Sequence, residues 1–299
     1  MTDIPLYKTF IKIEPIDKGW SSDKKYCIET ADGEKLLMRV SDISEYTRKK
    51  SEFEIMQKVA ALGIPMSLPI DFGICDNGKN VYSLLSWIDG RVAEDALPAL
   101  PSDQQYELGV KAGQYLRIMH AIPASPEQED WENRFNRKID RNIEKYKKCS
   151  IQISRDDRIL GYIVENRYLL KARPQSFQHG DYHVGNMVVS AQGELSIIDF
   201  NRFDYGDPWE EFNRIVWCAG CSKSFASGRI DGYFDGKAPE DFFRLLALYI
   251  SSNMLSSIVW AIPFGQGEVE TMKRQADRML DDFDGMENPV PTWYSSKNS

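Results

Sequence analysis

The most informative segment of the 299-residue chain spans residues 177–200 and reads FQHGDYHVGNMVVSAQGELSIIDF. Two apolar runs, residues 187–189 and 195–198, stand on either side of a polar turn that contains glycine, which is the pattern of a β-hairpin. If the turn is centred between Gln192 and Gly193, the numbers of paired residues sum to 385. The segment therefore predicts a short hairpin with polar residues at its open end.

This register places Asn186 opposite Asp199 at the open end of the hairpin, with Asp181 a few residues before the first strand. An amide carbonyl and a carboxylate are hard oxygen ligands of the kind that Mg²⁺ takes, together with phosphates and water. Asp181 then has the position of a base for an incoming hydroxyl group. An aspartate, an asparagine five residues later and an aspartate after a hairpin are the layout of kinase-type phosphoryl transfer.

Two other interpretations of the segment remain. His179, Asp181 and His183 alternate as in any half-buried strand, and in that case their polar side chains only cap loops. A metal hydrolase that uses the same three residues is a weaker alternative, because it leaves Asp199 and the first 88 residues unexplained. The three spaced positions and the consistent hairpin favour phosphoryl transfer.

Three motifs connect the chain to a known family: HGDYHVGN at residues 179–186, IIDF at 197–200 and GDPWEEFNR at 206–214. They resemble the aminoglycoside phosphotransferase family, whose relatives include choline, homoserine, fructosamine and methylthioribose kinases. The resemblance covers nearly the whole chain. It implies an α+β, bilobal protein-kinase-like fold, with a small β-rich N-terminal lobe and a larger helical C-terminal lobe. It also implies Mg²⁺ as cofactor and ATP or GTP as co-substrate.

The same resemblance gives roles to residues of the large lobe. It implies that Asp181 is catalytic and that Asn186 and Asp199 bind the metal. It further implies that His179 and Asp207 support the catalytic loop structurally, without touching the substrate.

In the small lobe, residues 19–26 stand where the family has its nucleotide-covering loop, and Ser21 or Ser22 is expected to meet a β-phosphate. Arg39, within LLMRV, stands at the position of the phosphate-pairing basic residue, and Glu52, in preference to Glu54, is its expected acidic partner. The chain departs from the family pattern twice. The loop has a single glycine, and Arg39 replaces the usual lysine, so a planar fork takes the place of a compact point charge.

Short strands around one helix predict that the first 88 residues form a β-β-α-β-β nucleotide-binding lobe, followed by a catalytic and substrate-binding lobe at residues 89–299. The hinge is expected at residues 86–90, where the resemblance implies that Ser86 and Ile88 hold the purine through main-chain atoms. The expected strands are residues 24–30, 34–40, 69–75 and 80–87, and the expected helices are residues 44–62, 103–120, 135–148, 156–171, 207–218 and 239–262.

Amino-acid composition limits the kinds of partner that the protein is expected to bind. With 37 Lys+Arg against 45 Asp+Glu the net charge is −8 and the pI about 5.1, which argues against a nucleic-acid partner. The five cysteines are scattered and are expected to be free thiols. The uncharged run 245–264 is long enough to span a membrane, but its four serines, one asparagine and Pro263 favour a buried helix. We expect a cytoplasmic protein without a membrane partner, either monomer or dimer.

The acceptor is harder to predict. An aminoglycoside or a similar antibiotic is the first expectation, since carboxylates and aromatic residues of the large lobe suit a hydroxylated, cationic substrate. A metabolic amino-alcohol or sugar kinase is the second, and a catalytically weak, nucleotide-binding pseudokinase is the third. Basic residues between 134 and 145 weaken a simple cation-binding interpretation. The carboxylates in question are Asp130, Glu132, Asp204, Glu210, Glu211, Asp231 and Asp235.

Overall fold

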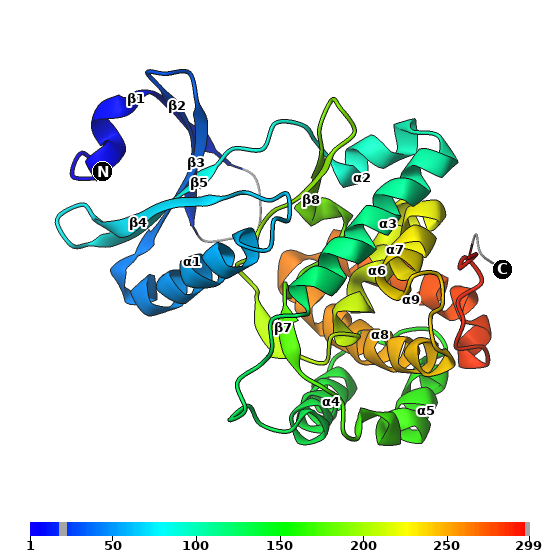
Figure 1. Cartoon of the computed structure of the whole chain (residues 1–299). Coiled ribbons are helices and arrows are strands. Elements are labelled where there is room, and N and C mark those ends of the chain that lie inside the picture. The colour runs from blue at the N-terminus through cyan, green and yellow to red at the C-terminus, as the bar shows by residue number, and fades with distance from the viewer. Residues whose placement is uncertain (18–22, 297–299) are drawn as a thin grey trace. The chain divides into compact units, whose positions relative to one another are not determined.

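An antiparallel five-stranded sheet occupies the N-terminal part of the chain (Figure 1). In their order across the sheet, the strands are β1 (Phe10–Ile16), β2 (Lys24–Thr30), β3 (Lys35–Asp42), β5 (Asn80–Ser86) and β4 (Pro69–Cys75). The computed structural model describes residues 1–17 and 23–296. Gly33 and Gly78 have positive φ angles of 84° and 85° in the turns that join β2 to β3 and β4 to β5. Four of the five strands confirm the sequence prediction, and β1 was not predicted.

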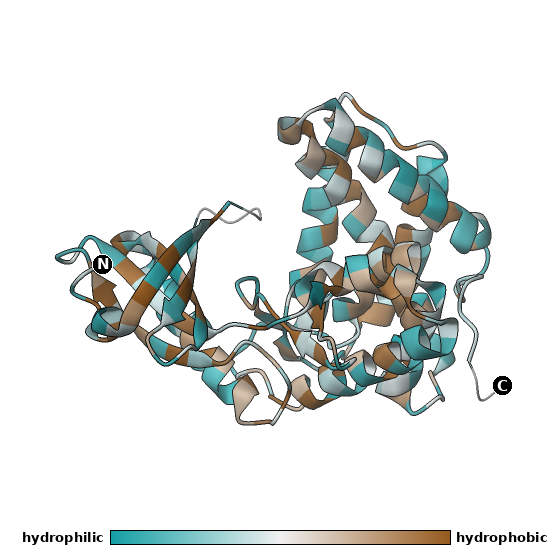
Figure 2. Cartoon of the chain, turned by 90° about the horizontal axis from the view of Figure 1, so that it is seen from above, coloured by the Kyte–Doolittle hydropathy of each residue, from teal (hydrophilic) through white to brown (hydrophobic). Residues whose placement is uncertain are grey.

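Successive side chains of β3 point to opposite faces of the sheet. Figure 2 shows both apolar (brown) and polar (teal) residues along the strands of the N-terminal part. Met38 is buried in an apolar core on one face, whereas Arg39 projects from the opposite face. Helix α1 (Tyr46–Ala60) packs against the sheet, with the ring of Phe53 at 5.4 Å from that of Phe72. Strand and helix together therefore fix the direction in which Arg39 points.

The chain divides into two compact units. Unit 1 comprises Met1–Ala93 and Gly185–Arg202, and unit 2 comprises Glu94–Val184 and Phe203–Ser299. This division differs from a single seam after residue 88, because the hairpin joins the N-terminal part. Strand β8 (Met187–Val189) pairs with both β9 (Leu195–Ile197) and β6 (Arg91–Val92).

The hairpin is present, but its predicted register is wrong by one residue. Paired numbers sum to 384, as in Met187 opposite Ile197. The physical reason is a three-residue turn, residues 191–193, in which Gly193 adopts a φ of 77°. Asn186 therefore lies opposite Ile198, whose N–H donates to the Asn186 carbonyl at 3.0 Å, and not opposite Asp199.

Unit 2 is mainly helical, and α3 and α7 form its closest pair (Figure 1). Each of these helices carries two glycines four residues apart, Gly109 and Gly113 on α3 and Gly228 and Gly232 on α7, and at each of the four a Cβ would lie within 2.2 Å of the other helix's backbone. The backbones can approach this closely only because side chains are absent there. The helices are α2 (Ala93–Ala96), α3 (Ser102–Met119), α4 (Trp131–Lys147), α5 (Asp156–Asn166), α6 (Ile215–Cys221), α7 (Lys223–Phe234), α8 (Glu240–Ala261) and α9 (Gln266–Asp282).

Helix α8 explains the long uncharged run. Glu240–Phe264 is long and apolar enough to cross a membrane, but 67% of its most apolar window is buried inside the protein. It packs against α4, α5 and α9. The prediction of a buried helix over this run is confirmed.

Other elements differ from the expectation. The helix predicted at 207–218 begins as a 3₁₀ turn, Glu210–Arg214, and is α-helical only from Ile215, because Asp207 and Glu210 are held by side-chain bonds. Helices α7 and α9 were not predicted. All five cysteines are free, as expected.

Candidate active site

In unit 1, the buried guanidinium of Arg39 contacts three carboxylates from three separate segments. Its Nη1 lies 3.2 Å from Glu52 Oε1 of α1 and 3.2 Å from Asp199 Oδ1, which follows β9. Its Nε and Nη2 donate to Asp23 Oδ2 at 3.0 and 2.7 Å. The predicted Arg39–Glu52 pair is present, and Asp199 joins it.

Two members of this cluster were missed by the sequence analysis. Lys49 of α1 is 5% exposed and donates to Asp23 Oδ2 and, at 3.4 Å, to Glu52 Oε2. Asp23 also accepts from the hydroxyl of Ser41 at 2.7 Å. Lys49 and Glu52 are three residues apart on a helix, which places them on one face, and this spacing was the available signal. Asp23 precedes β2 in a segment without any periodic pattern.

Burial alone raises the pKa of Asp23, but the charges of Arg39 and Lys49 and the Ser41 hydrogen bond outweigh it and hold that pKa well below 3.8. Asp23 therefore carries its negative charge at neutral pH. The cluster of Asp23, Arg39, Lys49, Glu52 and Asp199, termed the Arg39 cluster below, contains two cations and three carboxylates. Its net charge is compatible with the approach of a divalent cation.

Asp199 and Asn186 are the residues proposed to bind Mg²⁺. Asp199 has a φ of 67°, which is uncommon for a residue other than glycine, and its side chain is 30% exposed. Asn186 pairs with the residue directly before it, so both stand at the open end of the hairpin. Within residues 1–17 and 23–296, no group of three or more His, Cys, Asp or Glu side chains is arranged to hold a metal. One amide and one carboxylate oxygen nevertheless fit Mg²⁺, which shares its remaining positions with phosphates and water.

In unit 2, Asp181 lies between two basic side chains. Its Oδ1 is 3.4 Å from Nε of Arg214 and 3.6 Å from Nε2 of His183. Its side chain is 19% exposed, so one carboxylate is accessible in a polar environment. Arg214 stands in the quoted GDPWEEFNR motif, but the sequence analysis gave it no role.

Buried contacts hold the loop that carries Asp181. The ring of His179 is fully buried, and its Nδ1 accepts from the Asp181 N–H at 3.3 Å. Gly180, with a φ of 83°, donates its N–H to Glu211 at 3.0 Å. Both contacts are compatible with the supporting role expected of His179.

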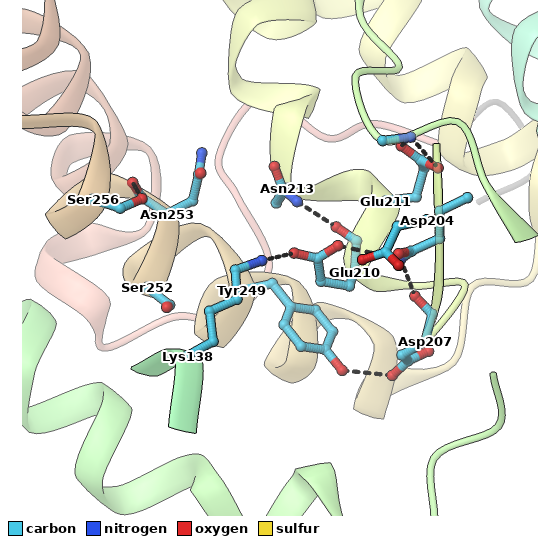
Figure 3. Close-up of polar contacts among 12 residues, drawn as sticks. Lys138, Asp204, Asp207, Glu210, Glu211, Asn213, Tyr249, Ser252, Asn253 and Ser256 are labelled. Atoms are coloured by element: carbon cyan, nitrogen blue, oxygen red, sulfur yellow. Dashed lines mark hydrogen bonds and ion pairs between the residues drawn. The ribbon is translucent and has the colours of Figure 1, made fainter. Parts of the chain in front are cut away.

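Asp207 is fully buried and serves as an anchor of unit 2. It accepts from Nε and Nη2 of Arg173 at 2.6 and 3.0 Å. It also accepts from the hydroxyl of Tyr249 at 2.5 Å, a bond that Figure 3 shows. Burial, and then the charge of Asp207, raise the pKa of Tyr249 well above its ordinary value. These bonds agree with the bracing role expected of Asp207.

The residues predicted to contact the nucleotide differ in their surroundings. Ser86 donates its N–H to Leu68 at 2.8 Å and accepts at its carbonyl from Ser67 at 2.6 Å, so its main-chain groups serve the sheet. Ile88 lines a pocket of about 390 Å³, which also involves Lys35 of β3. Ile88 therefore borders an open pocket, whereas the main-chain groups of Ser86 are engaged in the sheet. Ser21 and Ser22 lie outside the described residues.

Most of the carboxylates expected to attract a cationic acceptor are bonded to groups of this chain. Figure 3 shows one of these contacts, in which Glu210 accepts from Lys138 at 2.9 Å. Glu211 accepts from the Gly180 N–H. The others are Asp130 with the Asn133 N–H, Asp204 with Arg134, Asp231 with Tyr106 and Tyr294, and Asp235 with Arg117.

Comparisons with known proteins agree with this architecture. A model described as the phosphotransferase enzyme family matches residues 12–243. No curated protein matches the chain significantly by sequence. The fold of a thermostable mutant of the aminoglycoside phosphotransferase APH(4)-Ia, in its apo form, is similar, with a TM-score of 0.65 at 15% identity over 92% of this chain and 95% of that one.

Two further structures have the same fold. The GDP complex of wild-type aminoglycoside 2'-phosphotransferase-IIIa gives a TM-score of 0.65 at 14% identity, over 90% of this chain and 92% of that one. The amicoumacin kinase hAmiN, in complex with AMP-PNP and Ca²⁺, gives 0.63 at 13% identity, over 95% and 91%. The expected α+β, kinase-like fold is confirmed, while identities this low say nothing about the substrate.

Proposed function

Because the chain belongs to the phosphotransferase enzyme family, we propose that it transfers the terminal phosphoryl group of ATP or GTP to a hydroxyl group of a small molecule. The observation that carries this proposal is the guanidinium of Arg39, which contacts both Glu52 of α1 and Asp199 of the hairpin at 3.2 Å. The contacts assemble the phosphate-binding cation, its acidic partner and a metal ligand within one unit. The accessible carboxylate of Asp181 in unit 2 favours an active kinase over a pseudokinase, because a protein that only binds nucleotide does not need it.

In unit 1, Arg39 pairs with the nucleotide phosphates, and Asn186 and Asp199 hold Mg²⁺. When bound, the ion would supply positive charge at the phosphate oxygens. Glu52 and Asp23 orient the guanidinium fork of Arg39 for its phosphate contacts. Catalysis in this half of the site is positioning and charge compensation.

In unit 2, Asp181 accepts a hydrogen bond from the acceptor hydroxyl and takes its proton as the new P–O bond forms. Arg214, at 3.4 Å from Asp181 Oδ1, compensates the carboxylate charge and holds the side chain in place. His179 fixes the main chain at Asp181 through its ring Nδ1. The products are the nucleoside diphosphate and a phosphate monoester.

Two acceptor classes compete. An aminoglycoside or a similar antibiotic is supported by the acidic balance of the chain. A metabolic hydroxylated acceptor is favoured by one observation: six of the seven carboxylates expected to receive a polycation are already bonded within unit 2. A polycation would have to share these carboxylates with their present partners or displace those partners, so we place the metabolic acceptor first.

A coupled assay of nucleoside-diphosphate release, run with Mg²⁺ over aminoglycosides, other antibiotics, amino alcohols, sugars and hydroxy acids, tests the proposal. Asp181→Asn is expected to reduce kcat by at least a hundredfold and to leave the Kd for the nucleotide unchanged. Asp157→Asn removes an exposed carboxylate of α5 and is the matched control. Equal turnover of wild type and Asp181→Asn, or no acceptor-dependent release from any compound, contradicts the proposed function.

A further inference from the structure

A second pocket, of about 360 Å³, lies entirely within unit 2. Helix α6 forms one wall, helix α9 another, and the segment from Glu94 to Pro98 a third. The lining residues used below are Trp217 and Gly220 of α6, Arg274, Gln275 and Arg278 of α9, and Glu94.

The pocket has two positive charges that this chain does not neutralise closely. Arg274 and Arg278 are exposed and four residues apart, so they stand one above the other on α9. Neither has a carboxylate oxygen within 4 Å among residues 1–17 and 23–296. Glu94, which also lines the pocket, pairs with neither. Two guanidinium forks at a pocket wall are the arrangement that binds an oxyanion.

Two acidic residues of α9 are engaged with other groups of the chain. Glu270 accepts from Gln266 at 3.0 Å and pairs with Lys273, and Asp281 pairs with Arg155 at 2.9 Å. Burial raises the pKa of Asp282, although the positive charges of Lys223 and Arg278 lower it in part. None of the acidic residues of α9 lines the pocket.

Shape and polarity also fit a small ligand. The Nη1 atom of Arg278 lies 2.6 Å from the position that a Cβ of residue 220 would occupy, so Gly220 provides the space in which this guanidinium rests. Trp217 offers a flat apolar surface, and the buried Gln275 offers an amide with both a donor and an acceptor. A ligand with a polar, planar or hydroxylated body suits these walls.

The pocket is linked to the proposed chemistry through α6. Arg214, the residue directly before this helix, contacts Asp181 at 3.4 Å. Trp217 follows three residues later, on the same side of the helix one turn further along. The pocket wall and the contact to the proposed catalytic carboxylate are thus parts of one short rigid element.

We propose that this pocket holds the anionic group of the acceptor, so that the substrate is a small hydroxylated molecule with a carboxylate or phosphate ester. Arg274 and Arg278 bind the oxyanion, and Trp217 contacts the body of the molecule. This inference rests on the proposed function and deepens it, since it replaces a cationic acceptor by an anionic one.

Binding is tested without turnover. Phenyl phosphate is titrated by calorimetry into the full-length protein saturated with Mg²⁺ and a non-hydrolysable nucleotide, with phenol as the uncharged probe. Phenyl phosphate is expected to bind, at least tenfold more tightly than phenol. The double variant Arg274→Gln, Arg278→Gln is expected to lose at least tenfold in affinity. Lys273→Gln, which removes a charge from the same helix outside the pocket, is expected to leave the affinity unchanged.

Turnover distinguishes this inference from the proposed function. Hydroxy acids and sugar phosphates form two separate arms of the screen, so that the better substrates show whether the anionic group is a carboxylate or a phosphate ester. Amino sugars form a third arm, which tests cationic acceptors. The double variant is expected to raise KM for the preferred acceptor at least tenfold, with KM for the nucleotide unchanged. Absence of all acceptor turnover contradicts the proposed function alone, because the calorimetry still reports on the pocket. Equal affinity of wild type and double variant for phenyl phosphate, or a cationic best acceptor, overturns the anionic pocket.

Discussion

Arg39 and Lys49 donate to the same carboxylate oxygen, Oδ2 of Asp23. Two buried cations from a strand and a helix therefore depend on one short acidic side chain that precedes β2. Removal of one partner from a buried ion pair is costly, because it leaves charge that water cannot solvate. The Arg39 cluster is consequently a support of the fold of unit 1 as well as a candidate phosphate site.

Asp23→Asn is the direct test of this dependence. The amide keeps the shape but loses the charge, so Arg39 and Lys49 keep only Glu52 and Asp199 as anionic partners. We expect the free energy of unfolding to fall by roughly 2–4 kcal/mol, measured by urea denaturation. Glu54→Gln, on the exposed side of α1, is the control and is expected to change it by less than about 0.5 kcal/mol. A loss no larger for Asp23→Asn than for this control contradicts the dependence.

The pKa of Asp23 predicts how this contribution changes with pH. Although burial alone raises it, Arg39 and Lys49 hold the pKa in the folded protein below the ordinary 3.8. A carboxylate whose pKa is depressed by folding stabilises the fold fully above its unfolded pKa, and this stabilisation disappears as the pH falls through its folded pKa. The difference in unfolding free energy between wild type and Asp23→Asn is therefore expected to be constant above about pH 5 and to shrink at lower pH. Denaturation series across this range measure it, and a difference that grows on acidification rules the assignment out.

Arg39→Lys restores the residue type usual in the family and tests whether the chain depends on the fork. A lysine ammonium cannot donate to Asp23, Glu52 and Asp199 from three separate nitrogens. We expect KM for the nucleotide to rise about tenfold, equivalent to about 1.4 kcal/mol, with a smaller change in KM for the acceptor. Steady-state kinetics with each substrate varied in turn supply the comparison. A lower KM for the nucleotide in the variant than in the wild type contradicts the prediction, because the other residues of the cluster then position a lysine better than an arginine.

Sequence patterns predicted the sheet and α8 because their side chains alternate or form long apolar runs between turn residues. Strand β1 (Phe10–Ile16) was not predicted because it contains Pro15 and none of its residues is buried. Its sequence therefore shows no alternation of apolar and polar residues. Helix α7 was not predicted because nearly all of its residues are buried, including Arg229. Burial on every side leaves no amphipathic pattern in its sequence. A helix or strand that is buried on all sides, or on none, shows no periodic pattern of apolar residues in its sequence.

The candidate site shows the same limit. Asp181, Asn186 and Asp199 were found from spacing within 19 residues, although one residue of turn length changed which of them face each other. Asp23 and Lys49 are 26 residues apart, and only the pairing of β2 with β3 and the packing of α1 bring them together. Tertiary contacts of this kind are set by the whole sheet and have no local pattern.

The α3–α7 contact provides a stability test far from the proposed chemistry. A Cβ on residue 113 would lie 2.1 Å from the Arg229 carbonyl oxygen, and both backbones are held in helices, so the helices must separate. Gly113→Ala is therefore expected to lower the unfolding free energy by about 3 kcal/mol or more, although alanine is the better helix former. Gly161→Ala in α5 is the matched control, since nothing lies within 4 Å of its Cβ position, and it is expected to be neutral or to stabilise by up to about 1 kcal/mol. Equal stability of the two variants in thermal and urea denaturation would show that α3 and α7 do not approach this closely.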